Sequence, residues 1–186
     1  MKFKFTKLKI VSSTVLTLTA GLLTLAGSPT AAQDSTPWIK TDQTSVRLIS
    51  ALPNLGNRKE VKLGLQFKLK KGWKIYWRTP GDAGFPPNLN WQKSENLVKT
   101  DFGWPLPSRF EVLDLQTLGY KKEVVFPIPA TVKAPAQPLK IRAELNYLTC
   151  DDICIPYKTK LSFDLPAGGA APDTMSTNYH LISQYA

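Results

Sequence analysis

Residues 61–69 alternate between apolar and polar side chains without a break, and this alternation restricts the fold of the chain more than any other feature of its sequence. A two-residue period places successive side chains on opposite faces of a β-strand, so Val61 and the odd positions after it are expected to face a core. Further segments with strand-like patterns are 46–49, 73–77, 124–128, 139–147 and 159–165. No segment shows a long helical period of about 3.6 residues. The pattern predicts an all-β fold.

Fifteen prolines lie mainly between these segments, with concentrations at 79–87, 104–107 and 127–138. Proline lacks the amide hydrogen that a strand ladder needs, so these passages are expected to form edges, loops and turns. Many short strands separated by proline-rich passages are typical of a β-sandwich. We assign residues 33–166 to one such domain, which is large enough to fold without the help of a disulfide.

The first 32 residues have the pattern of a secretory signal peptide. Four lysines precede an apolar run from Ile10 to Ala26, and small residues at Thr30 and Ala32 favour cleavage after Ala32. The alternative is an uncleaved membrane anchor, but the run is diluted by hydroxyl side chains and is shorter than the roughly 20 residues of a typical span. The mature chain is therefore expected to be exported.

Charge limits the partners of the mature chain. The whole sequence has a formal net charge of +10, and loss of the four leader lysines leaves +6 (10 − 4). A moderate basic excess suits acidic proteins or an anionic membrane surface. Nucleic acid is not expected as a partner, because the chain is exported and has no dense run of Lys and Arg.

The C-terminal stretch 167–186 begins with a linker rich in Pro, Gly and Ala and continues as a helix-compatible segment from Thr174. Linkers usually lead to another folded part. We therefore expect these residues to begin a further segment of a longer protein; the alternative is a disordered tail.

Cys150 and Cys154 are the two cysteines of the chain. An even number in an exported protein suggests a disulfide. Residues four apart on an extended strand are about 13 Å apart, whereas a disulfide needs Cα atoms within about 7 Å. The chain is therefore expected to bend at residues 151–153, where one strand turns into the next.

Three roles are open to this pair: thiol–disulfide exchange, a structural bond in a non-catalytic binding sandwich, and a Cu(I) site of a copper-tolerance domain. Closing a loop of about five residues stabilises a fold by only about 2 kcal/mol, and short rings are more easily reduced, so exchange is favoured. A closed zinc site needs four ligands, and the one histidine, His180, is remote in sequence. We expect no metal and no organic cofactor.

Asp151 and Asp152 lie between the cysteines. Their negative charges are expected to raise the thiol pKa values and so to lower the reduction potential of the pair. The sign of this effect depends on nearby cations, of which Lys158 is one candidate.

Several spaced motifs resemble one family. They are GWKIYWRTPGDAGFPP at 72–87, WP at 104–105, RF at 109–110, GY at 119–120 and YLTCDDICIP at 147–156. In this order, over about residues 38–166, they are similar to the N-terminal periplasmic domain of the DsbD family, and most similar to its ScsB branch, which is linked to copper sensitivity. The best-known reductase of the family has a longer insertion between its cysteines.

This resemblance implies an immunoglobulin-like β-sandwich of the protein-disulfide reductase type. Such a periplasmic domain receives electrons from a membrane domain, in the same or another chain, through a thioredoxin-like domain. It passes them to periplasmic thioredoxin-fold proteins, either disulfide isomerases or cytochrome-maturation proteins. By this analogy Cys154 forms the mixed disulfide with the partner and Cys150 resolves it.

The resemblance also suggests which residues surround the cysteines. Tyr147 and Pro156 belong to the cysteine motif, and Tyr76 matches a tyrosine near the reductase's active site, although a core position is an equal alternative. The family's cap loop corresponds to about 110–120, so Phe110 and Tyr120 are candidate cap residues. Phe85, held between glycines and prolines in the 79–87 loop, is a candidate docking residue; the alternative is that this loop plugs one end of the sandwich.

Overall fold

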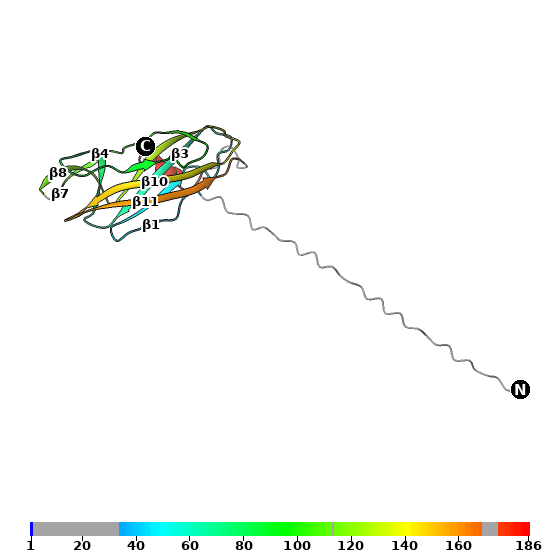
Figure 1. Cartoon of the computed structure of the whole chain (residues 1–186), viewed down its shortest axis with the longest axis horizontal. Coiled ribbons are helices and arrows are strands. Elements are labelled where there is room, and N and C mark those ends of the chain that lie inside the picture. Colours follow the sequence, from blue (N-terminus) through cyan, green and yellow to red (C-terminus); the bar gives the residue numbers. More distant parts are fainter. Residues whose placement is uncertain (2–33, 113, 169–174) are drawn as a thin grey trace. The chain divides into compact units, whose positions relative to one another are not determined.

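The computed structural model describes residue 1 and residues 34–112, 114–168 and 175–186 (Figure 1). The predicted signal peptide lies almost wholly outside the described residues, and so does much of the predicted linker. Within the described part, no helix has both the length and the apolar character needed to cross a membrane.

Two antiparallel sheets make up the fold (Figure 1). The first contains, in order, β1 (Ile39–Lys40), β2 (Thr44–Ser50), β3 (Glu60–Leu69), β9 (Glu123–Val132) and β6 (Leu97–Thr100). The second contains, in order, β11 (Cys154–Leu165), β10 (Leu139–Cys150), β4 (Lys74–Gly81), β8 (Leu115–Lys121) and β7 (Ser108–Val112), while β5 (Asn88–Asn90) pairs with β10. This arrangement confirms the predicted all-β, immunoglobulin-like sandwich.

The main core lies between the two sheets, and the alternation of residues 61–69 is the reason β3 can face it. All its odd positions are buried, as predicted, and Phe67 packs edge-on against Phe126 and Tyr147, with ring centroids 6.1 and 5.0 Å away. Gly64 and Gln66, on the opposite face of β3, are also buried. On that outer face the Gln66 side chain forms hydrogen bonds with Arg47 and Glu123.

The C-terminal residues cover part of this face. The short helix α1 (Tyr179–Ser183) buries Ile182 against β3, so a Cβ on Gly64 would come within 2.9 Å of the Ile182 side chain. Ser176 fixes the approach to the helix, because its amide donates to the carbonyl of Ala51 at 3.0 Å. The stretch expected to begin a further segment is thus docked on the sandwich in its described part.

Five strands were missed by the sequence pattern: β1, β5, β6, β7 and β8. Their runs are brief or lack clean alternation. The region matched to the family's cap loop, 110–120, lies mostly in the β7–β8 hairpin, with Ser108 opposite Gly119 and Val112 opposite Leu115. This hairpin ends the second sheet, because β7 is its last strand.

Strand β9 continues through Pro127 and Pro129 to Val132, further than the predicted 124–128. The two proline carbonyls accept hydrogen bonds from the amides of Gly103 and Asp101, at 2.7 and 2.9 Å. In an antiparallel ladder the N and O of one residue face the same neighbour, so the missing donors also face residues 101–103. The ladder to β3 therefore loses no hydrogen bond to proline.

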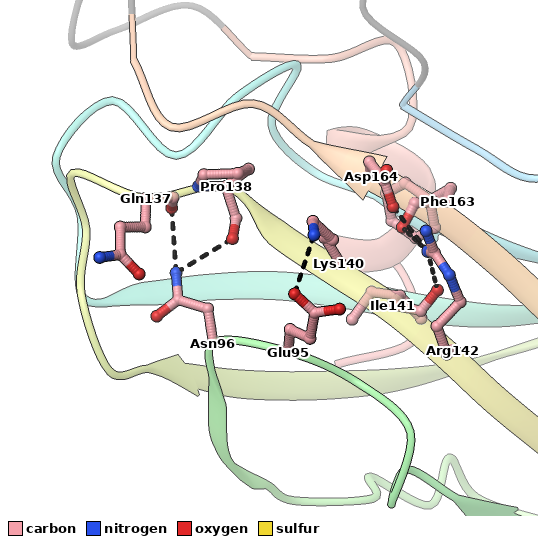
Figure 2. A network of polar contacts seen from close by, with 9 residues as sticks. All are labelled: Glu95, Asn96, Gln137, Pro138, Lys140, Ile141, Arg142, Phe163 and Asp164. Atoms are coloured by element: carbon pink, nitrogen blue, oxygen red, sulfur yellow. Dashed lines mark hydrogen bonds and ion pairs between the residues drawn. The ribbon is translucent and has the colours of Figure 1, made fainter.

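A polar network fixes the beginning of β10 (Figure 2). The Asn96 side-chain amide donates to the carbonyls of Gln137 and Pro138 at 2.9 and 3.3 Å, and Lys140 pairs with Glu95 at 2.8 Å. The register of β10 with β11 then holds without a break from Leu139 opposite Leu165 to Cys150 opposite Cys154. The cysteines therefore lie at the far end of a continuous two-stranded ladder.

Candidate thiol–disulfide exchange site

The two cysteines form a disulfide at the end of the β10–β11 hairpin. Cys150 is the last residue of β10 and Cys154 the first of β11, and their Cα atoms are 4.2 Å apart. The turn between them closes through a hydrogen bond of 3.0 Å from the amide of Asp151 to the carbonyl of Ile153. The predicted bend at 151–153 is confirmed, and the disulfide joins two directly opposed positions of the ladder.

The two sulfur-bearing residues differ in exposure. Cys150 is fully buried, whereas Cys154 is exposed, and its neighbour Ile153 is 61% exposed. Pro156, which the sequence analysis grouped with the cysteines, is exposed on β11. A protein partner approaching this hairpin would therefore meet Cys154 before Cys150.

Cys150 is buried in a small apolar cluster on the outer face of the second sheet, separate from the main core. The cluster contains Tyr76, Phe110, Val112 and Cys150, with Leu148 packed against it. Tyr76 and Phe110 have ring centroids 6.4 Å apart. Both residues were expected near the cysteines, and the structure brings both into the cluster.

The 79–87 loop covers this cluster. Gly84 has φ +95°, and a Cβ there would come within 2.4 Å of the Tyr76 ring, so the loop backbone lies directly on the ring. Burial raises the pKa of Tyr76, and within the described residues its hydroxyl has no hydrogen-bond partner. An unpaired buried hydroxyl costs about 1–3 kcal/mol, which makes this position unusual for an ordinary core residue.

A charge pair lies beside the buried cysteine. Lys74 stands opposite Cys150 in the ladder between β4 and β10, and its Nζ is 3.3 Å from the Asp151 carboxylate. That carboxylate rests on Gly72, where φ is +94° and a Cβ would overlap it at 2.2 Å. Thr149 ties β10 to β4 by donating to the Lys74 carbonyl at 2.9 Å. The negative charge of Asp151 is thus partly balanced, while Asp152 is exposed on the turn.

Other expected site residues lie elsewhere. Tyr147 is in the main core, where its hydroxyl bonds the Thr44 hydroxyl at 2.6 Å across the two sheets and burial raises its pKa. Tyr120 also belongs to the main core, with its ring 5.1 Å from Phe126 and its hydroxyl donating to the Pro105 carbonyl. Neither residue lies in the cluster around Cys150.

Phe85 and Lys158 do not join the cluster either. Phe85, in the 79–87 loop, is 41% exposed. Lys158 pairs with Glu144 at 2.7 Å on the β10–β11 ladder, so it does not serve as the cation beside the cysteines. Lys74 takes that place, and sequence reasoning missed it because only the pairing of β4 with β10 brings it to Cys150.

Val112 and Leu148 were also missed. Val112 lies on β7, whose sequence gave a weak alternation signal, and Leu148 lies on β10, whose alternation indicated only the main core. Neither pattern shows that a second apolar cluster exists on the outer face.

Among the described residues no group of three or more His, Cys, Asp or Glu side chains is arranged to hold a metal ion. The Cys150–Cys154 pair itself offers the chemistry of a dithiol and its disulfide.

Comparison with known proteins agrees with this geometry. The family model described as Thiol:disulfide interchange protein DsbD, N-terminal, matches residues 45–166. The N-terminal periplasmic domain of ScsB from Proteus mirabilis is 29% identical with a TM-score of 0.63, over 82% of this chain and 59% of that one. The reduced N-terminal domain of DsbD from Neisseria meningitidis is 20% identical with a TM-score of 0.39, over 67% and 86%. A search of curated proteins found no match.

The family match covers most of the sandwich, from β2 to the end of β11, and includes both cysteines. The ScsB domain shares the fold over most of this chain, although the match extends over little more than half of its own length. Sequence motifs, sandwich and cysteine hairpin thus agree, and the chain belongs to the family of DsbD N-terminal domains, which are thiol:disulfide interchange domains.

Proposed function

We propose that this domain relays electrons between two protein dithiols through reversible formation of the Cys150–Cys154 disulfide. The observation that carries the proposal is the difference in exposure between the two cysteines: Cys154 is exposed at a hairpin tip and Cys150 is buried directly behind it. In such an arrangement the Cys154 sulfur is accessible to a partner, and the Cys150 sulfur is shielded from it but close enough to attack the mixed disulfide. A bond serving only stability would gain little from so short a loop, about 2 kcal/mol.

The exchange proceeds in two displacements. The Cys154 thiolate of the reduced domain attacks one sulfur of the partner's disulfide; that bond breaks, the second partner sulfur leaves as a thiolate and takes up a proton, and a mixed disulfide forms. The Cys150 thiolate then attacks the Cys154 sulfur, and the first partner sulfur leaves and is protonated. In total, two electrons and two protons pass from the domain to its partner.

The cycle needs an electron donor. A thioredoxin-like dithiol linked to a membrane domain, in the same or another chain, reduces the Cys150–Cys154 bond by the reverse of these steps. The recipients are thioredoxin-fold proteins of the periplasm, either disulfide isomerases or cytochrome-maturation proteins. The leader pattern of residues 1–32 and the family support this location and these partners.

Trapping tests the assignment of the two cysteines. In the Cys150→Ala variant the mixed disulfide on Cys154 cannot be resolved, so adducts with an oxidised thioredoxin-fold protein should accumulate on non-reducing gels. The Cys154→Ala variant should trap little, because its remaining thiol is buried. The reverse pattern would reassign the two roles, and absence of adducts from both variants with every thioredoxin-fold protein tried would contradict the relay.

Titration against glutathione separates the relay from a structural bond. The native disulfide should be reduced within the range of other exchange proteins, above about −300 mV. A native bond that resists reduction below that value would favour a binding sandwich with a structural disulfide.

A further inference from the structure

Five lysines surround a surface hollow at the cysteine end of the sandwich. Leu69, Gly72 and Trp73 complete its lining. The lysines lie in or directly beside two turns, the one that joins β3 to β4 and the one that joins β8 to β9: Lys70, Lys71, Lys74, Lys121 and Lys122. At both turns the chain passes from one sheet to the other, so the lysines lie along the corner between the sheets.

This lysine cluster is in register with the disulfide. In the second sheet Cys154 is opposite Cys150, Cys150 is opposite Lys74, and Lys74 is opposite Lys121. Neighbouring strands are about 4.8 Å apart, which puts Lys121 roughly 14 Å from Cys154. A standard protein interface covers about 800 Å² per partner, a disc of roughly 16 Å radius. A partner centred on Cys154 would therefore extend over the lysines.

The positive charge of the cluster is largely uncompensated. Lys70, Lys71, Lys121 and Lys122 are exposed, and in the described part of the chain none of them forms an ion pair. Asp151 compensates Lys74 alone. Glu123 follows Lys122 directly, but its carboxylate accepts a hydrogen bond of 2.5 Å from Gln66 on the outer face of the first sheet.

The arrangement works against stability in two places. Lys74 and Lys121 are directly opposed on neighbouring strands, and like charges at such positions are destabilising. Lys122 has φ +65°, a left-handed backbone that is uncommon for a residue other than glycine. Local conflicts of this kind concentrate at functional sites, where they are retained for a reason other than folding.

The structure holds these lysines in place. The Leu69 amide donates to the Lys122 carbonyl at 2.6 Å, so the two turns are joined through their backbones. The ammonium groups of Lys74 and Lys121 lie 5.8 and 5.2 Å from the centroid of the Phe110 ring, which itself belongs to the cluster around Cys150. The Phe110 ring therefore contacts both the lysine cluster and the apolar cluster that buries Cys150.

We propose that this lysine cluster is the docking surface for an acidic rim next to the reactive disulfide of the redox partner. The inference rests on the exchange function proposed above and names the charge of the partner. A protein is favoured over an anionic membrane because the cations are in register with Cys154, the sulfur that must remain accessible to a partner disulfide. Opposite charges around the reacting sulfurs would raise the rate of encounter and orient the two proteins.

Three synthetic peptides provide the test. They carry the same Cys-Gly-Pro-Cys disulfide, flanked by four glutamates, four glutamines or four lysines. The second-order rate at which the reduced domain reduces each peptide is measured by acid quenching and chromatography. At low ionic strength the wild type should reduce the acidic peptide about tenfold faster than the neutral one, and the ratio should fall towards one as salt is added.

The decisive variant neutralises the four exposed lysines, as Lys70→Gln, Lys71→Gln, Lys121→Gln and Lys122→Gln. Its acidic-to-neutral ratio should fall close to one, while its rate with the neutral peptide stays unchanged. The matched control neutralises four other exposed lysines that form no ion pair in the described chain and lie on the first sheet or its turns away from the cysteines: Lys59, Lys62, Lys99 and Lys133. The control should keep the full ratio.

The outcomes separate the inferences. Equal ratios in the two variants would overturn the docking surface and leave exchange intact, as would a wild-type ratio of one with no dependence on salt. The docking surface would also be overturned if the decisive variant kept its peptide ratio and lost only its binding to phosphatidylglycerol vesicles, because the lysines would then bind a membrane. A wild-type domain that reduces none of the peptides would remove the exchange function and the docking surface together.

Discussion

Charged side chains surround both ends of strand β10, but they are arranged differently at the two ends. At the Leu139 end the cations have acidic partners: Lys140 is 2.8 Å from Glu95, and Arg142 is 2.6 Å from Asp164 (Figure 2). At the Cys150 end five lysines line one hollow, and Asp151 pairs with one of them. Pairing at the first end fixes the hairpin, and the uncompensated charge at the second leaves it able to bind something else.

The largest effect is expected from Gly84→Ala, which breaks the cover of the cysteine end. The new Cβ would meet the buried Tyr76 ring within 2.4 Å, in a backbone conformation that disfavours any side chain. The 79–87 loop must move, and the free energy of unfolding should fall by about 2–4 kcal/mol. Chemical denaturation measures it. An unchanged stability would show that the loop does not hold the cluster around Cys150.

Asn96→Ala should weaken the opposite end. Asn96 has φ +64°, its side-chain amide donates to three backbone carbonyls, and its oxygen accepts from the Ala134 amide at 2.8 Å. Loss of these bonds should cost about 2 kcal/mol without changing the reduction potential. A shift in potential as large as that of a cysteine-end variant would mean that the two ends are not independent.

Removing the disulfide should have a smaller or similar effect on folding. The double variant Cys150→Ala/Cys154→Ala should lose about 2 kcal/mol, the value for a loop of about five residues. Denaturation of the oxidised wild type and the variant compares them directly. A loss above about 4 kcal/mol would favour a structural bond over an exchange site.

Charge at the turn should tune the potential. Asp151→Asn/Asp152→Asn removes two negative charges and leaves Lys74 unpaired beside Cys150. Thiolates then form more easily, the reduced state gains stability and the potential should rise, by about 30 mV for each 1.4 kcal/mol gained. Glu95→Gln/Asp164→Asn is the matched control at the other end and should leave the potential unchanged. A lower potential in the turn variant would reverse the assigned sign.

The smallest effect is expected from a single surface ion pair. Lys140→Gln removes the partner of Glu95, and both side chains are largely exposed, at 40% and 67%. The loss of stability should be below about 1 kcal/mol and should vanish at high salt. A larger loss would show that the network at the Leu139 end acts as a cooperative unit.

Much of the sandwich could be predicted from local pattern. The six strand segments expected from the sequence correspond to β2, β3, β4, β9, β10 and β11, and the bend between the cysteines followed from their spacing. Strands β7 and β8 could not be predicted, because their runs are short or lack a clean alternation of apolar and polar side chains. The 110–120 region, which the resemblance matched to the family's cap loop, lies mostly within these two strands.

In the candidate site, too, some features could be predicted from the sequence and others could not. Its chemistry was contained in two cysteines and their spacing, and family motifs singled out Tyr76 and Phe110, which do lie beside Cys150. The same reasoning gave equal weight to Tyr120 and Tyr147, which pack in the main core. Aromatic residues on opposite faces of one sheet look alike in sequence, since only the register shows which face each one occupies.

The sequence by itself determined six of the strands of this protein and the bend that brings two cysteines together across a tight turn, because both depend on residues close together in the chain. Tertiary structure alone decided that Cys150 is buried and Cys154 exposed, and that Lys74 and Lys121 lie in register with them. These residues meet because β4, β8, β10 and β11 are hydrogen-bonded neighbours in one sheet. Pairing between distant strands depends on the packing of the whole core, and no local pattern encodes it.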